Sequence, residues 1–349
     1  MRQRRHAWAA AHAVVLAALM AGTGARGIAA AEGVQTPSIW APVSTPATAL
    51  LELFYLVVPI CAAIFVIVGG LLAYTVARFR HRPGTYDREP PQVYGSNQIE
   101  LAWTVVPLLV VVVLFLVSAR TIVAVQNAAP PPGALEVRVV GHQWWWEIRY
   151  PKLGIVTANE LHVPLSDPAT PAPTFLTLES ADVVHSFWVP QLAGKTDVIP
   201  NRRNHTWIDP QVPGMFVGQC AEYCGTQHAH MLLRVYVHSR EEFEGWVREQ
   251  QRPSADEPSV QAGRDVFQRT ACINCHRVGG TVADGVFGPD LTHLMSRHTI
   301  GAGVAANTRD NLHAWIENPG TLKPGARMPA MKLTDAEVDQ VAAYLATLR

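Results

Sequence analysis

The segment Cys220-Ala-Glu-Tyr-Cys224-Gly-Thr-Gln-His228-Ala-His-Met231 brings two thiols, an imidazole and a thioether together within twelve residues. Thiolate and thioether are soft ligands that favour copper, and imidazole suits copper as well. A mononuclear blue-copper site needs only one cysteine, so the second cysteine permits two thiolates to bridge two copper ions. Two metals that share one electron change little in geometry on reduction, which suits electron transfer. The segment therefore predicts a copper centre for electron transfer.

Two other chemistries remain open for this segment. The two cysteines could instead form a disulfide bond, or the segment could bind zinc, although methionine is a poor zinc ligand. The spacing alone also leaves the second histidine ligand open. The candidates are His142, His162, His185, His205 and His230.

The sequence around this segment alternates in the manner of β-strands. Residues 135–140, 175–179 and 232–237 are short, β-rich apolar runs without a helical period. Prolines between positions 164 and 173 break the middle of this region into loops. We predict an antiparallel sandwich or barrel over residues 127–240.

Two apolar runs precede the β-rich region and predict a transmembrane hairpin within residues 32–126. Residues 53–77 and 101–119 carry no charged side chain, and each run is long enough to span a bilayer as a helix. We expect the spans at about residues 53–77 and 101–122. The loop between them carries Arg78, Arg80, Arg82 and Arg88 against Asp87 and Glu89. The positive-inside rule places this loop in the cytoplasm and everything after about Gln126 outside it.

Residues 1–31 are typical of a secretory signal peptide. An arginine-rich start precedes a short apolar core at 13–20 and a small-residue run at 29–31. An uncleaved anchor helix is the alternative. The low share of charged residues, 16%, agrees with a membrane protein. The net charge of zero lacks the basic footprint of a nucleic-acid-binding protein.

A second cofactor motif lies near the C-terminus. Cys272-Ile-Asn-Cys275-His276 has the spacing of covalent haem attachment, in which two thiols bond the porphyrin and the histidine binds its iron. A redox dithiol or a disulfide is the alternative. The motif predicts a c-type haem in an exported domain.

Helix signals set the limits of this C-terminal domain. A capping box at Ser239 begins a helix, and a polar, proline-bearing linker completes residues 241–257. Residues 258–349 are then expected to form an all-helical domain. A second capping box, at Thr334, begins its last helix, which we expect to reach about Leu348.

Five motifs resemble subunit II of cytochrome c oxidase and occur in that family's order. They are Glu100-Leu-Ala-Trp-Thr-Val-Val-Pro107, Gly141-His-Gln-Trp-Trp-Trp146, Val184-His-Ser-Phe-Trp-Val-Pro190, Lys195-Thr-Asp-Val-Ile-Pro200 and the segment 220–231. The resemblance covers about residues 50–240 and implies an all-β cupredoxin domain, a Greek-key barrel with a dinuclear copper A centre. The copper ligands that the family implies are His185, Cys220, the carbonyl of Glu222, Cys224, His228 and Met231.

The same resemblance implies roles beyond the copper ligands. Trp144 matches the tryptophan through which electrons reach the copper, whereas packing is expected for the two tryptophans after it. The Glu222 side chain would meet a magnesium ion shared with subunit I. Glu100 matches a carboxylate near a proton-uptake path of the large subunit, with a solvated flank of the span as an equal alternative. Asn201 stands where the family has glycine and tolerates a left-handed backbone, and His230 is expected to be solvated or structural.

Residues 258–349 resemble a class I cytochrome c. Pro289 matches the proline whose carbonyl orients the haem-binding histidine. A methionine opposite that histidine raises the reduction potential of the iron. Met328 fits this position best, with Met331 and Met295 as alternatives.

Together these resemblances imply the electron-input subunit of a respiratory, caa-type haem–copper oxidase. Electrons from cytochrome c or another reduced periplasmic donor would pass through haem c and copper A to haem in subunit I, where oxygen is reduced to water and protons are pumped. We expect a multi-pass protein of the bacterial inner membrane with both soluble domains on the periplasmic side. Its expected partners are subunit I, other oxidase subunits and membrane lipid, with no nucleic acid.

Two alternatives keep the copper chemistry but change the function. One is a nitrous-oxide or nitric-oxide reductase with a similar copper centre, and the other is a free-standing, membrane-anchored electron carrier. Quinol-oxidising relatives of subunit II lack the copper ligands that are present in this sequence.

Overall fold

The computed structural model of the protein describes residues 36–80, 92, 94–126, 130, 133–169, 171–254 and 257–349. The predicted signal peptide and the loop arginines Arg82 and Arg88 lie outside these residues.

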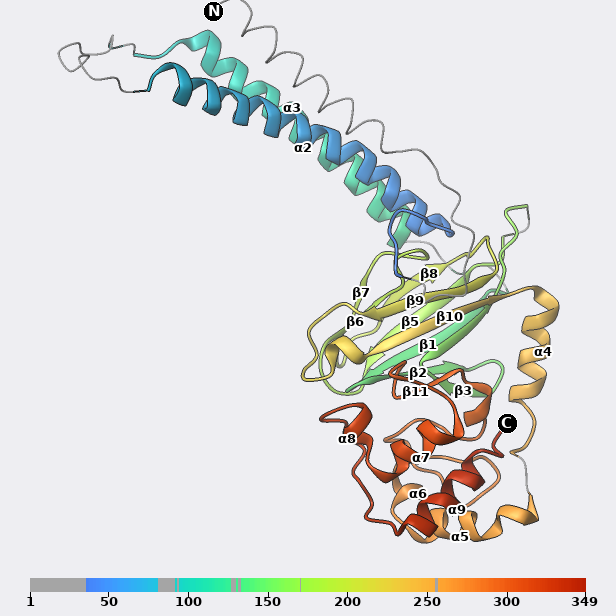
Figure 1. Ribbon diagram of the computed structural model, residues 1–349. Coiled ribbons are helices and arrows are strands. Elements are labelled where there is room, and N and C mark those ends of the chain that lie inside the picture. The colour runs from blue at the N-terminus through green and yellow to red at the C-terminus, as the bar shows by residue number, and fades with distance from the viewer. Residues whose placement is uncertain are drawn as a thin grey trace, which may run out of the picture. The chain divides into compact units, whose positions relative to one another are not determined.

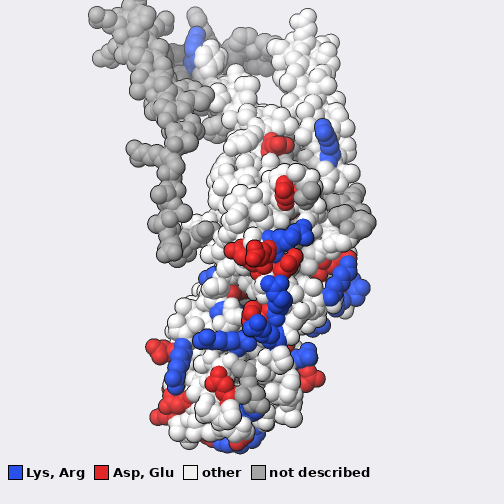
Figure 2. All heavy atoms as spheres, turned by 90° about the vertical axis from the view of Figure 1, so that its right-hand side faces the viewer, with Lys and Arg blue, Asp and Glu red and all other residues white. Residues whose placement is uncertain are grey.

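The predicted hairpin is formed by helices α2 (Thr45–Arg78) and α3 (Asn97–Gln126), which pack side by side (Figure 1). Both helices are long and apolar enough to cross a membrane, by length and composition. Most of their large apolar side chains are exposed. On the face drawn in Figure 2 the hairpin is mostly white, and the charged side chains gather over the soluble domains. The hairpin therefore presents an apolar surface suited to lipid or to other membrane subunits.

The β domain consists, within the described residues, of two five-stranded sheets around one apolar core (Figure 1). The first sheet has the order β3-β2-β1-β5-β8, and the second has the order β4-β10-β9-β6-β7. The strands are β1 (Leu135–His142), β2 (Trp145–Tyr150), β3 (Ile155–Ala158), β4 (Glu160–Pro164), β5 (Thr174–Ser180), β6 (His185–Trp188), β7 (Thr196–Val198), β8 (Asn204–Ile208), β9 (Gly214–Cys220) and β10 (Leu232–His238). Alternate side chains point into the core, as Leu176 and Leu178 of β5 do, and Trp146 and Phe187 fill its centre.

The all-β prediction is confirmed, and most of the described strand pairs are antiparallel as expected, but two are parallel. Strand β1 pairs with β5 in parallel, and β10 pairs with β4 in parallel. The chain leaves the first sheet after β3, contributes β4 to the second sheet, and returns with β5. Only strands that are joined by a tight hairpin must be antiparallel, so these crossovers permit parallel neighbours.

The two outer ends of the hairpin are tied to the end of β8. Asp209 caps α2 by accepting hydrogen bonds from the Ser44 hydroxyl at 2.8 Å, the Thr45 N–H at 2.7 Å and the Thr45 hydroxyl at 2.6 Å. The indole N–H of Trp207 donates to the Val125 carbonyl at 2.7 Å, in the last turn of α3. Both helix ends are thereby held by β8 and the residue that follows it.

Helix α4 (Arg240–Gln250) follows β10 and confirms the first predicted capping box. The Ser239 side chain accepts from the Glu242 N–H, while the Glu242 carboxylate accepts from the Ser239 N–H. The apolar face of α4 places Trp246 against Tyr150 and His162 of the β domain.

The C-terminal domain is helical, as predicted. Its described elements are α5 (Gln261–Arg269), α6 (Cys272–Cys275), α7 (Arg309–Glu317), α8 (Pro319–Leu322), α9 (Asp335–Leu345), β11 (Thr299–Ile300), β12 (Ala305–Ala306) and the 3-10 turns η3 (Pro258–Val260) and η4 (Leu294–Ser296). A further 3-10 turn, η2 (His228–His230), lies between β9 and β10 of the β domain. Helices α5 and α9 cross closely because Gly263 has no side chain: a Cβ there would lie 1.9 Å from the Gln340 carbonyl oxygen. The last helix ends at Leu345, short of the predicted Leu348, because the chain turns there and the Leu348 carbonyl accepts from the Met295 N–H.

Candidate copper and haem sites

The predicted copper ligands meet at one end of the β domain. His185 begins β6, Cys220 ends β9, and Cys224 lies in the loop that follows; all three are buried. Their ligand atoms lie within 4.8 Å of one another. The pairing of β6 with β9 places Phe187 opposite Cys220 and so brings the histidine strand next to the cysteine strand.

The remaining predicted ligands surround this group. Met231 Sδ lies 3.9 Å and His228 Nδ1 3.6 Å from Cys224 Sγ, and the Glu222 carbonyl oxygen lies 3.2 Å from Cys220 Sγ. The two cysteine sulfurs are 3.7 Å apart, and the described cysteines, these two included, are free thiols. Five donors of the soft and imidazole types that copper prefers therefore converge, together with one backbone carbonyl oxygen.

The structure decides which of the five candidate histidines joins the segment. His185 does so, whereas the rings of the other four bond elsewhere. Those four contacts are His142 to Glu147, His162 to His238, His205 to Thr177 and His230 to Gln227. The expectation that His230 is structural agrees with its bond to Gln227, at 2.7 Å.

Asp182, which the sequence argument missed, fixes the orientation of His185. Its Oδ1 lies 2.8 Å from His185 Nε2, which leaves Nδ1 facing the Cys220 sulfur at 3.9 Å. Asp182 also accepts from the backbone N–H of Gln143 at 2.6 Å. An acidic residue three positions before a predicted histidine ligand is the local signal that could have found it.

Electrostatics at the site favour one thiolate before any metal binds. The contact between the two sulfurs lowers the pKa of Cys220 to about 3 and raises that of Cys224 above its usual value. Burial lowers the pKa of His185, but its hydrogen bonds to Asp182 and Cys220 outweigh burial and raise it above the usual value.

The other residues to which the resemblance assigns roles lie nearer the surface. The Glu222 carboxylate is 44% exposed and lies 3.9 Å from Lys195 Nζ. Glu100 is exposed in the first turn of α3. Asn201 has a φ of 61°, so the predicted left-handed turn is confirmed. Magnesium binding at Glu222 and a proton-path role for Glu100 stay predictions.

The haem-attachment residues line a cavity of about 810 Å³. Cys272 and Cys275 belong to the short helix α6, and His276 follows it. The His276 ring bonds through Nδ1 to the Pro289 carbonyl at 2.8 Å, which leaves Nε2 as the free ligand atom. Gly288 permits this, because a Cβ there would lie 2.5 Å from the imidazole Cε1. The cavity, the paired thiols and the oriented imidazole fit a covalently bound haem.

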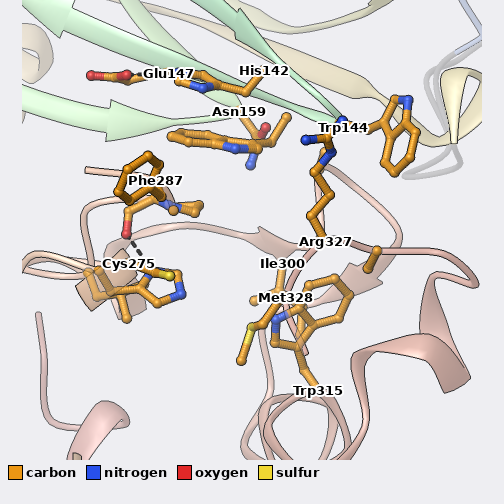
Figure 3. Close-up of a pocket in the computed structure, with 18 of the residues that line it drawn as sticks. His142, Trp144, Glu147, Asn159, Cys275, Phe287, Ile300, Trp315, Arg327 and Met328 are labelled. Atoms are coloured by element: carbon orange, nitrogen blue, oxygen red, sulfur yellow. Dashed lines mark hydrogen bonds and ion pairs between the residues drawn. The ribbon is translucent and has the colours of Figure 1, made fainter. Parts of the chain in front are cut away.

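Two of the three candidate distal methionines line this cavity. They are Met328 and Met331, whereas Met295 packs with the core of the domain. Figure 3 shows Met328 and Cys275 on opposite sides of the cavity, as a distal ligand would require. Met328 stays the predicted ligand.

Trp144 links the haem cavity to the copper segment. Trp144 is one of the residues that line the cavity, and its indole N–H donates to the Cys224 carbonyl at 3.0 Å. The side-chain amide of Gln143 donates to the same carbonyl at 2.7 Å. Trp146 is fully buried in the core and Trp145 stacks on His142, so the packing roles predicted for both agree with their positions.

Buried charges where the helical domain meets the β domain were also missed by the sequence argument. They are Glu160, Arg297 and Lys323, each less than 10% exposed. Each lies in a segment without a recognisable motif, so neither spacing nor composition could single it out.

Three family models match the chain in succession. The transmembrane domain of cytochrome c oxidase subunit II matches residues 40–121, its periplasmic domain matches residues 168–237, and cytochrome c matches residues 260–349. These matches confirm both resemblances that the motifs suggested.

Curated relatives match this chain over most of their own length. Cytochrome c oxidase subunit 2 of Alkalihalophilus pseudofirmus is 34% identical over 298 residues, which are 83% of this chain and 84% of the relative. The Bacillus subtilis protein of the same name is 31% identical over 296 residues, 79% and 82% of the two chains. A crystal structure of the periplasmic domain of subunit II of cytochrome oxidase from Bradyrhizobium japonicum shows 31% identity and a TM-score of 0.33, and covers 35% of this chain and 97% of that one.

Matches to the membrane domain, the periplasmic domain and cytochrome c thus occur in one chain, in the order in which the sequence motifs predicted them. The match to a curated relative spans the membrane, copper and cytochrome regions together. The chain therefore belongs to the cytochrome c oxidase subunit 2 family, carries a C-terminal cytochrome c domain, and is an electron-transferring subunit of a membrane-bound haem–copper oxidase.

Proposed function

We propose that the chain passes electrons from a reduced periplasmic donor, through a covalent haem c and a dinuclear copper A centre, to haem in subunit I. There oxygen would be reduced to water with proton pumping. The bound haem and copper pair supply one-electron carriers. The chain's own residues hold these carriers in place, orient their ligands and exclude water from the space between them.

One observation carries the proposal: Trp144 contacts both candidate sites. It is among the residues that line the cavity of the haem-attachment residues, and its indole N–H donates to the backbone carbonyl of the copper-segment residue Cys224. One residue therefore adjoins both the haem cavity and the copper segment. This supports direct transfer within one chain and explains why a tethered domain replaces a diffusing donor, since a tether raises the effective concentration.

The copper-site residues divide into ligands and an orienting group. Cys220, Cys224, His185, His228, Met231 and the Glu222 carbonyl would hold the copper ions. Asp182 would keep His185 in the tautomer that presents Nδ1 to the metal, because its carboxylate accepts from Nε2. The Glu222 side chain would help to bind magnesium at the contact with subunit I.

On the haem side, Cys272 and Cys275 would bond the porphyrin, and His276 and Met328 would bind its iron. Pro289 accepts from His276 Nδ1 and so directs Nε2 into the cavity. The hairpin would anchor the chain in the bacterial inner membrane, next to subunit I and lipid, with both soluble domains on the periplasmic side.

The test is flash reduction of the haem in the purified oxidase, with no soluble cytochrome c present. We expect two copper atoms and one covalent haem per chain, a mixed-valence copper signal, and copper reduction that matches haem reoxidation in rate. Cys220→Ser is the control, because it removes a bridging thiol and leaves the haem site intact. Slow haem reoxidation with the copper site fully loaded would contradict the proposal.

A further inference from the structure

A lysine of the haem domain is buried against the copper domain. Lys323 is 3% exposed, and its Nζ donates to three backbone carbonyls, each at 2.8 Å. Two of these carbonyls, those of Trp144 and His230, belong to the copper domain, and the third, of Gly301, belongs to the haem domain. An ammonium group has three N–H donors, so this site satisfies each of them.

A carboxylate of the copper domain is buried in turn against the haem domain. Glu160 of β4 is fully buried, and it accepts from the backbone N–H groups of His298 and Thr299 and from the Thr299 hydroxyl, at 2.9 to 3.1 Å. Arg297, next to these residues, also crosses the contact and donates to the Thr157 hydroxyl at 3.2 Å. Each domain thus inserts a charged side chain among polar groups of the other.

This arrangement is compatible with only one position of the haem domain relative to the copper domain. A buried charge is tolerated only when hydrogen bonds replace its lost hydration. The partners of Lys323 and Glu160 lie largely on the opposite domain, so a slide of a few ångströms would leave both charges buried and unpaired. Polar contacts of this kind contribute specificity of orientation more than raw affinity.

The segment held by Lys323 is the one that leads to the predicted distal methionine. Arg327 places its guanidinium 5.8 Å from the centre of the Trp144 ring and donates to the side-chain oxygen of Gln143. The side-chain amide of Gln227, in the copper segment, donates to the Pro324 carbonyl. Figure 3 shows Arg327 reaching from the haem domain toward Trp144. One short stretch before Met328 therefore contacts Trp144 and the copper segment together.

We infer that Lys323 and Glu160 are positioning residues that lock the haem domain onto the Trp144 face of the copper domain. The docked domain delivers electrons through Trp144 and at the same time closes that face to an external donor. The delivery half of this inference rests on the proposed function, whereas the docking half does not.

Chemical labelling of the complete oxidase tests the docking directly. The lysines of the chain are Lys152, Lys195, Lys323 and Lys332. Once accessible, Lys323 would lose the effect of burial on its pKa and would be acetylated at about the rate of the exposed Lys152 and Lys332. We expect mass spectrometry after brief acetylation at pH 7 to find Lys323 unmodified while those two react. Acetylation of Lys323 at their rate, or faster, would overturn the inference.

Hydrogen exchange then measures the strength of the lock. The amides of His298 and Thr299 donate to Glu160 across the contact, so they exchange when the domains part. Lys323→Met should speed this exchange by about ten- to a hundredfold, because a hydrogen-bonded charged group is lost. Lys152→Met, a matched change at an exposed lysine, should leave it unchanged. Equal exchange in Lys323→Met and the parent protein, with haem and copper contents intact, would refute the role of Lys323.

A third measurement separates positioning from mere stability. In Lys323→Met, soluble reduced cytochrome c should reduce the copper directly and faster than in the parent, since the Trp144 face is uncovered more often. The haem reduction potential and the copper spectrum should stay the same. Protected Lys323 with no haem-to-copper transfer would defeat the proposed function and leave the docking intact. Fast haem-to-copper transfer with a freely reactive Lys323 would refute the docking and leave the proposed function intact.

Discussion

Removal of the Asp182 carboxylate is expected to weaken the copper site without changing any ligand. Asp182 Oδ1 lies 2.8 Å from His185 Nε2, and Oδ2 accepts from the Gln143 N–H at 2.6 Å. The carboxylate therefore fixes both His185, the predicted copper ligand, and the backbone next to Trp144. Its side chain is only 24% exposed, so water replaces these contacts poorly.

The size of the effect follows from how such carboxylates act on metal-binding histidines. Loss of the partner of a ligating histidine typically costs about ten- to a hundredfold in metal affinity, which corresponds to about 1.4 to 2.8 kcal/mol. We expect Asp182→Ala to lie in this range. Asp182→Asn keeps an oxygen acceptor but loses the charge, so its effect should be smaller.

The assay is a chelator titration of the copper-loaded protein, followed by its visible and electron paramagnetic resonance spectra. Asp167→Ala serves as the control, because Asp167 is an exposed aspartate of the same domain that bonds only a local backbone N–H. The reasoning fails if Asp182→Ala retains copper at the same chelator concentration as the parent protein. It also fails if Asp182→Asn binds copper more weakly than Asp182→Ala does.

Three further changes follow from single contacts. Asp209→Ala removes the long-range cap of α2 and should cost about 1 to 3 kcal/mol of stability, seen as a lower midpoint in thermal unfolding of the solubilised chain; an unchanged midpoint would argue against the cap. Burial lowers the pKa of both His162 and His238, whose rings share a 2.8 Å hydrogen bond near Arg297. Below about pH 6.5 the unfolded chain therefore binds more protons than the folded chain. The free energy of unfolding should be highest above this pH and should fall as the pH drops toward the lowered pKa values of the folded state. The melting temperature of His162→Phe should fall less steeply over the same range. Gly263→Ala should push α5 away from α9, because the new Cβ would meet the Gln340 carbonyl. Thermal unfolding followed by circular dichroism should show a less stable haem domain. An unchanged melting temperature would mean that the helices can separate at little cost.

Features that depend on neighbours in the sequence could be predicted from the sequence. The haem motif needs two thiols and an imidazole within five residues, and the copper segment supplies most of its ligands within twelve. The capping boxes at Ser239 and Thr334 are complete within four residues each, and both form as predicted. The membrane helices follow from apolar length alone. In each case the chemistry is set by local spacing, and the fold needs only to preserve it.

Features that join distant parts of the chain could not be read from spacing. Five histidines were equivalent candidates until the pairing of β6 with β9 brought His185 beside Cys220. The parallel pairing of β1 with β5 depends on crossovers between sheets, which leave no mark on the alternation of either strand.

The sequence by itself therefore determined which cofactors this protein can hold, because covalent haem attachment and soft copper ligation both require particular side chains at close spacing. Only the tertiary structure decided how the two sites face each other. Trp144 and Cys224 are 80 positions apart in the sequence, and Lys323 and Trp144 are 179 positions apart. Glu160 is 138 and 139 positions from its partners His298 and Thr299. A charge buried at such a contact is stabilised by backbone groups that any sequence offers, so its partners become visible only when the chain is folded.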